Sequence, residues 1–270
     1  MPQLIVVSIS YAWNEVSFPK AYLRRQCLEF LKLGLQGVSV ISASADCGPA
    51  GTGCSCLDPS TGQALGPLST YGNFNPVVPA SCPYVTSVGG TQIRANGSVY
   101  DSEVVFRHSS ATHISSSGGG FSNLFDAPEY QKGAIDHYLQ RPDINERLQN
   151  LTGKFNPLGR GVPDVSSNAA NFVAAINGQL ITVFGTSASA PVFASILTKI
   201  NDARLHVGKK PVGFVNPVLY SHATVMTDIV EGSNYGCGVE GFHAGPGWDP
   251  VTGLGTPEYK KLLTLYLDLP

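Results

Sequence analysis

The sequence predicts an α/β fold in which helices flank a parallel sheet, and its first fifty residues carry the clearest signal. Residues 4–10 form a largely β-branched run, which is typical of a strand buried on both faces. Apolar residues then recur at helical spacing, with Ser17 as the expected N-cap and Gly37 as the end of the helix. Residues 38–44 indicate a second buried strand. Because a crossover of this length joins parallel strands, we expect a right-handed strand–helix–strand unit.

Composition limits both the number of domains and the class of partner. The chain has 270 residues, of which 43% are hydrophobic, enough for one full-sized core and therefore one domain over residues 1–270. The 17 basic and 19 acidic residues give a net charge of −2 and no basic stripe, so nucleic acid is not an expected partner. No apolar run approaches the roughly 20 residues that cross a bilayer, and the N-terminus lacks the basic and long apolar regions of a signal peptide.

Turn residues mark the later elements. The run Ser115–Ser122 is either a flexible linker or a segment whose glycines let the backbone approach a ligand closely, and the sequence leaves both open. Residues 172–184 predict a hairpin with Asn177-Gly178 as its tight turn. Thr256 and Pro257 are expected to cap a last helix, whose apolar residues follow at helical spacing.

Cysteines and glycosylation sequons bear on the compartment. The number of cysteines is even, and three of them lie within ten residues. These three are not expected to bind zinc, because the sequence has neither a second cysteine pair nor a pair of spaced histidines to complete the site. Two sequons, at Asn96 and Asn150, favour the secretory pathway together with the cysteines. The missing signal peptide argues the other way unless the chain is a fragment. The cysteines are Cys27, Cys47, Cys54, Cys56, Cys82 and Cys237.

Ser187 stands at a junction between a predicted strand and a predicted helix, in the string Gly-Thr-Ser-Ala-Ser-Ala-Pro from Gly185 to Pro191. At a helix N-terminus a hydroxyl feels the positive end of the helix dipole, and small neighbours leave room for a substrate carbonyl. From its position alone, Ser187 is either a helix cap or a nucleophile. The whole string resembles the nucleophile motif of the subtilisin-like clan, Gly-Thr-Ser followed by three residues and Pro, and so favours the nucleophile.

Two families of this clan differ in the base that activates the serine. Classical subtilisins use a histidine from a His-Gly-Thr segment, and none of the six histidines here is followed by Gly-Thr. Sedolisins use a glutamate, together with an aspartate in the oxyanion hole. The segment Ser44-Ala45-Asp46-Cys47-Gly48 is similar to their oxyanion motif, although Ala45 replaces the usual glycine.

Further segments extend this similarity along the chain, at residues 79–91, 117–123, 163–165 and 245–253. The chain therefore resembles the sedolisin family, including tripeptidyl peptidase I and its fungal relatives, from end to end. The resemblance implies a subtilisin-like parallel sheet and a monomeric acid serine peptidase for peptide or protein substrates, secreted or held in a lysosome or vacuole. Ser187 would be the nucleophile. Asp46 would stabilise the oxyanion, and it must be protonated to donate a hydrogen bond, which favours acid conditions.

The resemblance also implies a calcium site and a disulfide. Backbone carbonyls suit Ca²⁺ as well as carboxylates do, and glycines let the chain curl around one centre. The family further suggests a disulfide from Cys237 to the loop after Asp46, with Cys54 as the expected partner and Cys47 as the second choice. The implied calcium ligands are the side chains of Asp228 and Asp249 and the carbonyls of Ile229, Gly245 and Gly247.

The catalytic glutamate of the family, with its partner aspartate, has no match in this sequence. In the family both lie well upstream of the oxyanion motif, and only 45 residues precede Asp46 here. Neither Glu15 nor Glu29 is expected to be the base. We therefore expect the C-terminal part of a sedolisin catalytic domain, truncated at its N-terminus. Two hypotheses follow: a calcium-stabilised acid peptidase of the tripeptidyl-peptidase or endopeptidase type, or an inactive pseudo-peptidase fragment that retains calcium and peptide binding.

Overall fold

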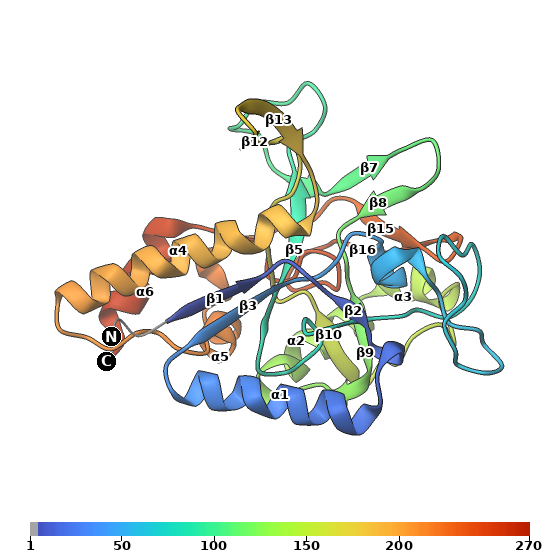
Figure 1. The fold of residues 1–270 in the computed structure, drawn as a ribbon, viewed down its shortest axis with the longest axis horizontal. Helices are drawn as coiled ribbons and strands as arrows, with labels where there is room; N and C mark the ends of the chain where they lie inside the picture. The colour runs from blue at the N-terminus through green and yellow to red at the C-terminus, as the bar shows by residue number, and fades with distance from the viewer. Residues whose placement is uncertain (1–4) are drawn as a thin grey trace.

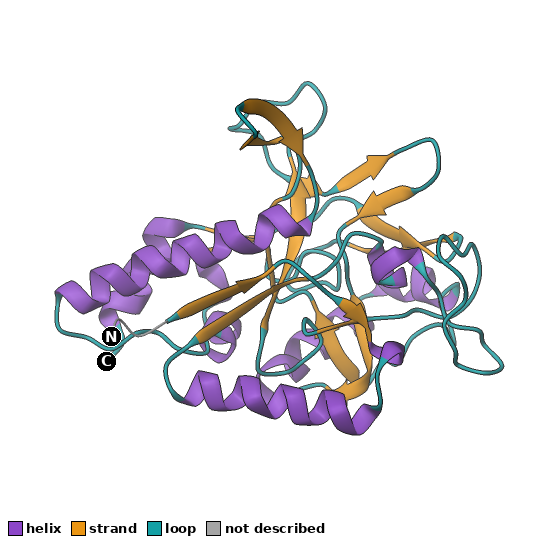
Figure 2. Ribbon diagram, in the orientation of Figure 1, coloured by secondary structure: helices purple, strands orange, loops and turns teal. Residues whose placement is uncertain are grey.

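A parallel sheet lies at the centre of the computed structural model, which describes residues 5–270 (Figure 1). In spatial order its parallel strands are β1 (Val6–Ile9), β3 (Ser39–Ala43), β5 (Thr86–Gln92) and β11 (Val165–Asn168). A short fifth strand, β6 (Val104–Val105), pairs antiparallel with the end of β5. Helices flank this sheet (Figure 2), so the predicted fold class is confirmed.

The helices pack on the sheet from opposite sides. They are α1 (Lys20–Leu35), α2 (Glu129–Gln140), α3 (Pro142–Gln149), α4 (Thr186–His206), α5 (Asn216–Ser221) and α6 (Tyr259–Asp268). α4 lies along all four parallel strands with α6 beside it, and α1 contacts β3 from the other side (Figure 1). Neighbouring residues of β3 reflect this, since Val40 packs in the cluster that includes α1 and Ile41 packs in the larger core that includes α4. Among the described residues, no helix has both the length and the apolar content that crossing a membrane requires.

Short antiparallel ribbons and 3₁₀ turns surround the sheet. The ribbons are β2 (Trp13–Asn14) with β4 (Val77–Val78), β7 (Arg107–Ser109) with β8 (Ile114–Ser116), β9 (Gly120–Asp126) with β10 (Gly159–Val162), β12 (Phe172–Ile176) with β13 (Gln179–Val183), β14 (Met226–Thr227) with β17 (Thr256–Pro257), and β15 (Ser233–Gly236) with β16 (Val239–His243). The 3₁₀ turns are η1 (Glu15–Ser17), η2 (Gly48–Ala50), η3 (Thr52–Cys54) and η4 (Ala223–Val225). The predicted hairpin is confirmed as β12–β13, because Asn177 and Gly178 form its turn with φ of 50° and 77°.

The first strand–helix unit is confirmed, but its ends differ from the prediction. Leu4 lies outside the described residues, and β1 is only partly buried because it is the edge strand of the sheet. α1 takes Pro19, not Ser17, as its N-cap, and Ser17 lies in η1. The fixed φ of proline suits a helix start, which explains why this position prevails. Gly37 follows the end of α1 with a φ of 85°, as predicted for a helix terminus.

Two further segments correct or decide a prediction. Thr256 and Pro257 form β17 rather than a helix cap, so α6 begins at Tyr259. The run Ser115–Ser122 is buried throughout, which rules out the flexible linker. A Cβ atom at Gly118 would lie 1.9 Å from the carbonyl oxygen of Ser44, so this glycine lets two backbone segments touch directly before Asp46.

Three disulfides tie the chain together, Cys27–Cys82, Cys47–Cys54 and Cys56–Cys237. The predicted pairing of Cys237 with Cys54 is wrong by one cysteine, and the second choice, Cys47, is wrong by two. Cys54 and Cys47 are joined to each other across a seven-residue separation, which leaves Cys56 for Cys237. Both Cys56 and Cys237 are buried in the main core, where they close a loop of 181 residues.

An ion pair between Arg160 and Asp164 is completely buried. Arg160 Nη2 lies 2.5 Å from Asp164 Oδ2, which also accepts a hydrogen bond of 2.7 Å from the amide of Ser87 in β5. The other carboxylate oxygen accepts a 3.1 Å hydrogen bond from the hydroxyl of Tyr220 in α5. The carboxylate therefore joins the central strand, the β10–β11 connection and α5.

Replacing Arg160 with methionine should strongly destabilise the fold, because Asp164 would remain buried without its cation. The expected loss is about 3–5 kcal/mol in the free energy of unfolding, measured by urea denaturation at neutral pH. Arg25→Met is the matched control, since it breaks an exposed pair with Glu29 and should leave the denaturation midpoint almost unchanged. Equal midpoints for the two variants would contradict the role assigned to the buried pair.

Candidate active site

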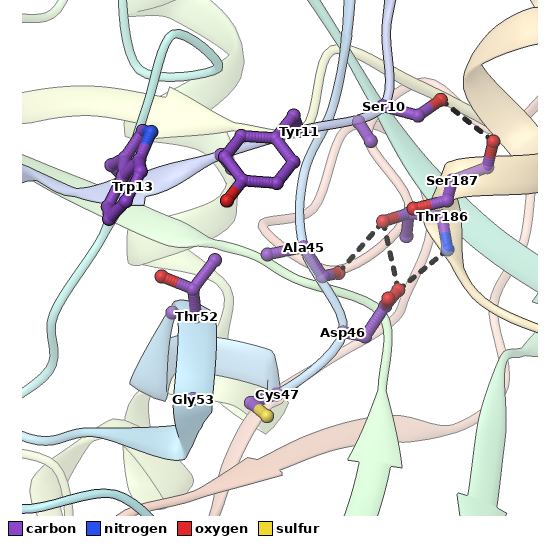
Figure 3. Close-up of a pocket in the computed structure, with 13 residues that line it drawn as sticks. Ser10, Tyr11, Trp13, Ala45, Asp46, Cys47, Thr52, Gly53, Thr186 and Ser187 are labelled. Atoms are coloured by element: carbon purple, nitrogen blue, oxygen red, sulfur yellow. Dashed lines mark hydrogen bonds between the residues drawn. The ribbon is translucent and has the colours of Figure 1, made fainter.

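A pocket of about 390 Å³ opens where the carboxyl ends of β1 and β3 meet the N-terminus of α4 (Figure 3). This edge of a parallel sheet is where open α/β folds place their ligands. The two predicted catalytic residues, Ser187 and Asp46, both line this pocket. They come from segments far apart in the sequence and are brought together by the parallel order of the strands.

Ser187 is the second residue of α4, and it is exposed. Gly185 occupies the N-cap position, so the interpretation of Ser187 as a cap is wrong. The backbone at Gly185 has a φ of 119°, and a Cβ atom there would lie 2.8 Å from Asp46 Oδ2. Glycine is therefore required both for the turn into α4 and for the close approach of Asp46.

Asp46 binds the start of α4 through one of its two carboxyl oxygens. Oδ1 accepts hydrogen bonds from the amide of Thr186 at 2.6 Å and from its hydroxyl at 3.0 Å (Figure 3). The Thr186 amide belongs to the first turn of α4 and has no acceptor within the helix, so Asp46 supplies one. Within residues 5–270 Oδ2 has no hydrogen-bond partner, which leaves it available to a bound molecule.

Burial raises the pKa of the Asp46 carboxyl above its usual value, although the hydrogen bonds from Thr186 act in the opposite direction. Just before it, Ala45 adopts a φ of 79°, in the left-handed region that favours glycine. The chain thus keeps the loop shape of a glycine motif at a cost of about 1–2 kcal/mol of backbone strain.

Two contacts of the pocket wall could not be predicted from the motifs. Ser10, at the end of β1, donates a 2.8 Å hydrogen bond from Oγ to the carbonyl of Ser187. Asn14 Oδ1 accepts a 2.8 Å hydrogen bond from the amide of Thr52, and Asn14 Nδ2 donates to the Thr52 carbonyl at 3.1 Å. The available signal was the position of Ser10 at the carboxyl end of a predicted strand.

No second carboxyl lines the pocket in the described part of the chain. Glu15 is buried elsewhere, where Oε1 accepts a 2.5 Å hydrogen bond from Ser122 and Oε2 accepts one of 2.9 Å from the amide of Asn123. Glu29 is partly exposed on α1, where it pairs with Arg25 and Lys32. None of the histidines in residues 5–270 reaches the pocket lining either. The lining therefore contains no group placed to take a proton from Ser187 other than Asp46.

The five residues predicted to bind calcium lie in two loops, one after β14 and one after β16, which a hydrogen bond joins. Asp228 Oδ2 accepts a 2.8 Å hydrogen bond from the amide of Gly247, and Asp249 Oδ2 accepts one of 3.1 Å from the amide of Gly245. Asp249 is fully buried and has no ion-pair partner in the described residues, and burial raises its pKa to about 7. A buried carboxylate without a cation fits a metal site. Within residues 5–270 no three His, Cys, Asp or Glu side chains gather for a metal, so carbonyl oxygens of residues such as Ile229 would have to complete it.

Known proteins share both the sequence and the fold. Tripeptidyl-peptidase SED1 of Arthroderma otae is 53% identical over 275 residues, which cover 98% of this chain and 40% of that protein. Aorsin of Aspergillus oryzae is 47% identical, over 98% of this chain and 41% of its own length. A solved structure of Pseudomonas sedolisin, a serine-carboxyl proteinase, aligns with a TM-score of 0.73 and 26% identity, over 96% of this chain and 64% of that one. No family model matches the chain.

The sheet, the helices and the position of the pocket define a subtilisin-like α/β fold. The chain is homologous to sedolisin-family peptidases over nearly its whole length, and the resemblance predicted from its motifs is confirmed. It spans about two-fifths of the length of the curated relatives that it matches.

The raised pKa of Asp46 predicts a pH-dependent contribution to stability. A carboxyl whose folded pKa lies above its unfolded value of 3.8 stabilises the fold fully below that value, and the contribution is lost as the pH rises through the folded pKa. Wild type should therefore lose free energy of unfolding relative to Asp46→Asn as the pH rises above about 4, because asparagine does not titrate.

Asp58→Asn provides a control of opposite sign. Hydrogen bonds from Ser60 and Thr61 lower the pKa of the exposed Asp58, so its contribution is present above the unfolded value and lost at lower pH. Urea denaturation at a series of pH values measures both differences. Parallel pH profiles for the two variants would contradict a raised pKa at Asp46.

Proposed function

We propose that this chain forms part of a serine-carboxyl acid peptidase that hydrolyses peptide bonds, with Ser187 as nucleophile and Asp46 as oxyanion donor. The observation that carries the proposal is that Asp46 and Ser187 line the same pocket. Asp46 Oδ1 accepts hydrogen bonds from Thr186, the residue next to Ser187, while Asp46 Oδ2 has no partner in residues 5–270. Relatives named as tripeptidyl-peptidases support this activity. The enzyme would either release tripeptides from the end of a substrate or cleave the substrate at internal bonds.

In this mechanism Ser187 Oγ attacks the carbonyl carbon of the scissile bond and its proton passes to a base. The carbonyl oxygen becomes an oxyanion, and a protonated Asp46 donates a hydrogen bond to it from Oδ2. Burial favours the protonated form of Asp46, and acid conditions complete the protonation. The tetrahedral intermediate then collapses, the C–N bond breaks and the leaving amine takes the proton from the base. Water then attacks the acyl group on Ser187, which releases the carboxylic acid product and restores the serine hydroxyl.

The base is the missing part of this mechanism. Asp46 cannot serve, because it must remain protonated to stabilise the oxyanion. We propose that a carboxylate from a segment outside the described residues takes the proton from Ser187, in keeping with the relatives being longer than this chain. The second hypothesis, an inactive fragment that binds calcium and peptides, is favoured by the same observation that no second carboxyl lines the pocket in residues 5–270.

We further propose a structural calcium ion held by the side chains of Asp228 and Asp249. The carbonyls of Ile229, Gly245 and Gly247 would complete its ligands. When bound, the ion supplies positive charge to the buried Asp249, which otherwise has no cation partner in the described residues. The chain itself fixes both carboxylates through the glycine amides of the loop.

Secretion, or delivery to a lysosome or vacuole, would suit an acid peptidase with three disulfides. We propose that the protein acts as a monomer.

An acid-pH assay with a tripeptide-releasing substrate tests the peptidase proposal. Residues 1–270 alone should hydrolyse it negligibly, because losing one member of a catalytic triad costs about 10⁴–10⁶ in turnover. A version extended at its N-terminus should be active, and Ser187→Ala in that version should abolish the activity. Activity of residues 1–270 that Ser187→Ala removes would instead mean that a base lies within the chain, and an extended version without activity would favour the inactive fragment.

Chelation tests the calcium proposal. Removing calcium should lower the melting temperature by several degrees, because a ligand at about 100 times its Kd contributes about 2.7 kcal/mol. Asp228→Asn should abolish this difference, whereas Asp202→Asn, an exposed substitution on α4, should retain it. Identical melting curves for wild type with and without chelator would eliminate the site.

A further inference from the structure

One of the three disulfides borders the Ser187 pocket, and it differs from the other two in exposure. Cys47 follows Asp46 directly and lines the pocket, and its partner Cys54 is partly exposed. Cys47 and Cys54 also line a second cavity of about 220 Å³, which Cys237 borders as well. The cysteines of the other two disulfides are 0–3% exposed. Because Cys54 is partly exposed and Cys47 also borders the Ser187 pocket, a small thiol reaches Cys47–Cys54 more readily than the other two bridges.

The Cys54 end of this bridge is anchored to the body of the protein independently of Cys47. Its carbonyl accepts a 3.0 Å hydrogen bond from the amide of Ser69. Two residues earlier, Thr52 is held by the two hydrogen bonds to Asn14 described above. The disulfide carries this anchorage to Cys47, the residue next to Asp46.

The Asp46 side also has restraints of its own, since the Ala45 carbonyl accepts hydrogen bonds from the amide of Gly118 at 2.7 Å and from the hydroxyl of Thr186 at 3.1 Å. The Asp46 carbonyl accepts a 2.9 Å hydrogen bond from the amide of Ser116, and the left-handed Ala45 precedes it. A left-handed conformation such as that of Ala45 is strained and persists only where the surrounding structure holds it. Loss of the Cys47–Cys54 disulfide should therefore let this loop relax.

We infer that the Cys47–Cys54 disulfide positions Asp46 against Thr186 and is the first of the three to be reduced, so that mild thiol reduction loosens the active-site loop before the fold is lost. Only the catalytic meaning of this loosening rests on the proposed function. In the reduction a dithiol supplies two electrons, the S–S bond breaks, two Cys S–H groups form, and the dithiol closes to its cyclic disulfide.

The amide of Thr186 reports on this contact selectively. As the first residue of α4 it has no acceptor within the helix, and its hydrogen bond goes to Asp46 Oδ1 at 2.6 Å. Its protection from hydrogen exchange therefore measures how long Asp46 stays in place. A general loosening of the fold would instead appear in β3 and β5, at amides such as that of Val88.

Graded treatment with dithiothreitol, followed by alkylation and peptide mapping, gives the order in which the bridges open. We expect Cys47 and Cys54 to be alkylated before any of the other four cysteines. At the same dithiothreitol concentration, exchange at the Thr186 amide should accelerate at least about tenfold, with exchange at Val88 unchanged. Earlier alkylation of another pair, or unchanged exchange at Thr186 once Cys47 and Cys54 are alkylated, would overturn the inference.

A double substitution, Cys47→Ser with Cys54→Ser, tests the same contact without reductant and should reproduce the faster exchange at Thr186. The matched control, Cys27→Ser with Cys82→Ser, removes a buried bridge that lies in a separate hydrophobic cluster and does not line the Ser187 pocket, and it should leave the ratio of exchange at Thr186 to that at Val88 unchanged. If a variant fails to fold, the graded reduction of wild type still decides. Neither readout involves hydrolysis, so both remain valid if the proposed peptidase activity fails.

Discussion

The rest of the molecule depends on an ion pair that water does not reach. Arg160 and Asp164 have no exposed surface, and removing one member of a buried ion pair leaves the other charge uncompensated. The Asp164 carboxylate accepts hydrogen bonds from the amide of Ser87 in β5 and from the hydroxyl of Tyr220 in α5. Its backbone carbonyl accepts a hydrogen bond from the amide of Leu254. One residue thus sets the spacing between the centre of the sheet, a helix beneath it and the loop that leads out of the proposed calcium site.

In the candidate active site, too, a single carboxyl group connects separate parts of the fold. Asp46 satisfies the first amide of α4 with one oxygen and leaves the other without a partner in residues 5–270. The helix dipole and the Thr186 hydrogen bonds favour an ionised carboxyl, whereas burial favours a neutral one. The raised pKa means that burial prevails. A carboxyl held in this way is fixed in direction by the fold and yet able to donate a hydrogen bond in acid.

Sequence patterns predict those parts of the structure that local geometry or a short motif determines. The hairpin at Asn177 requires two left-handed residues, and the positions of Ser187 and Asp46 follow from parallel strands that end at one edge. The exposure of β1 could not be predicted, because a strand's place at the edge of a sheet depends on the whole topology. The helix start also escaped prediction, since Ser17 and Pro19 both carry start signals and only packing decides between them.

The spacing of Cys54 and Cys56 has a consequence for how the protein reaches its native state. Both cysteines lie in the same loop, and either can reach Cys237 while the chain is still unstructured. Loop-closure entropy barely distinguishes them, because the two rings would differ by two residues in about 180. Oxidation ahead of folding would therefore produce both isomers in similar amounts. A bond between Cys47 and Cys54 leaves Cys56 as the one cysteine of this loop that can pair with Cys237, so the small ring determines the partner of the large one.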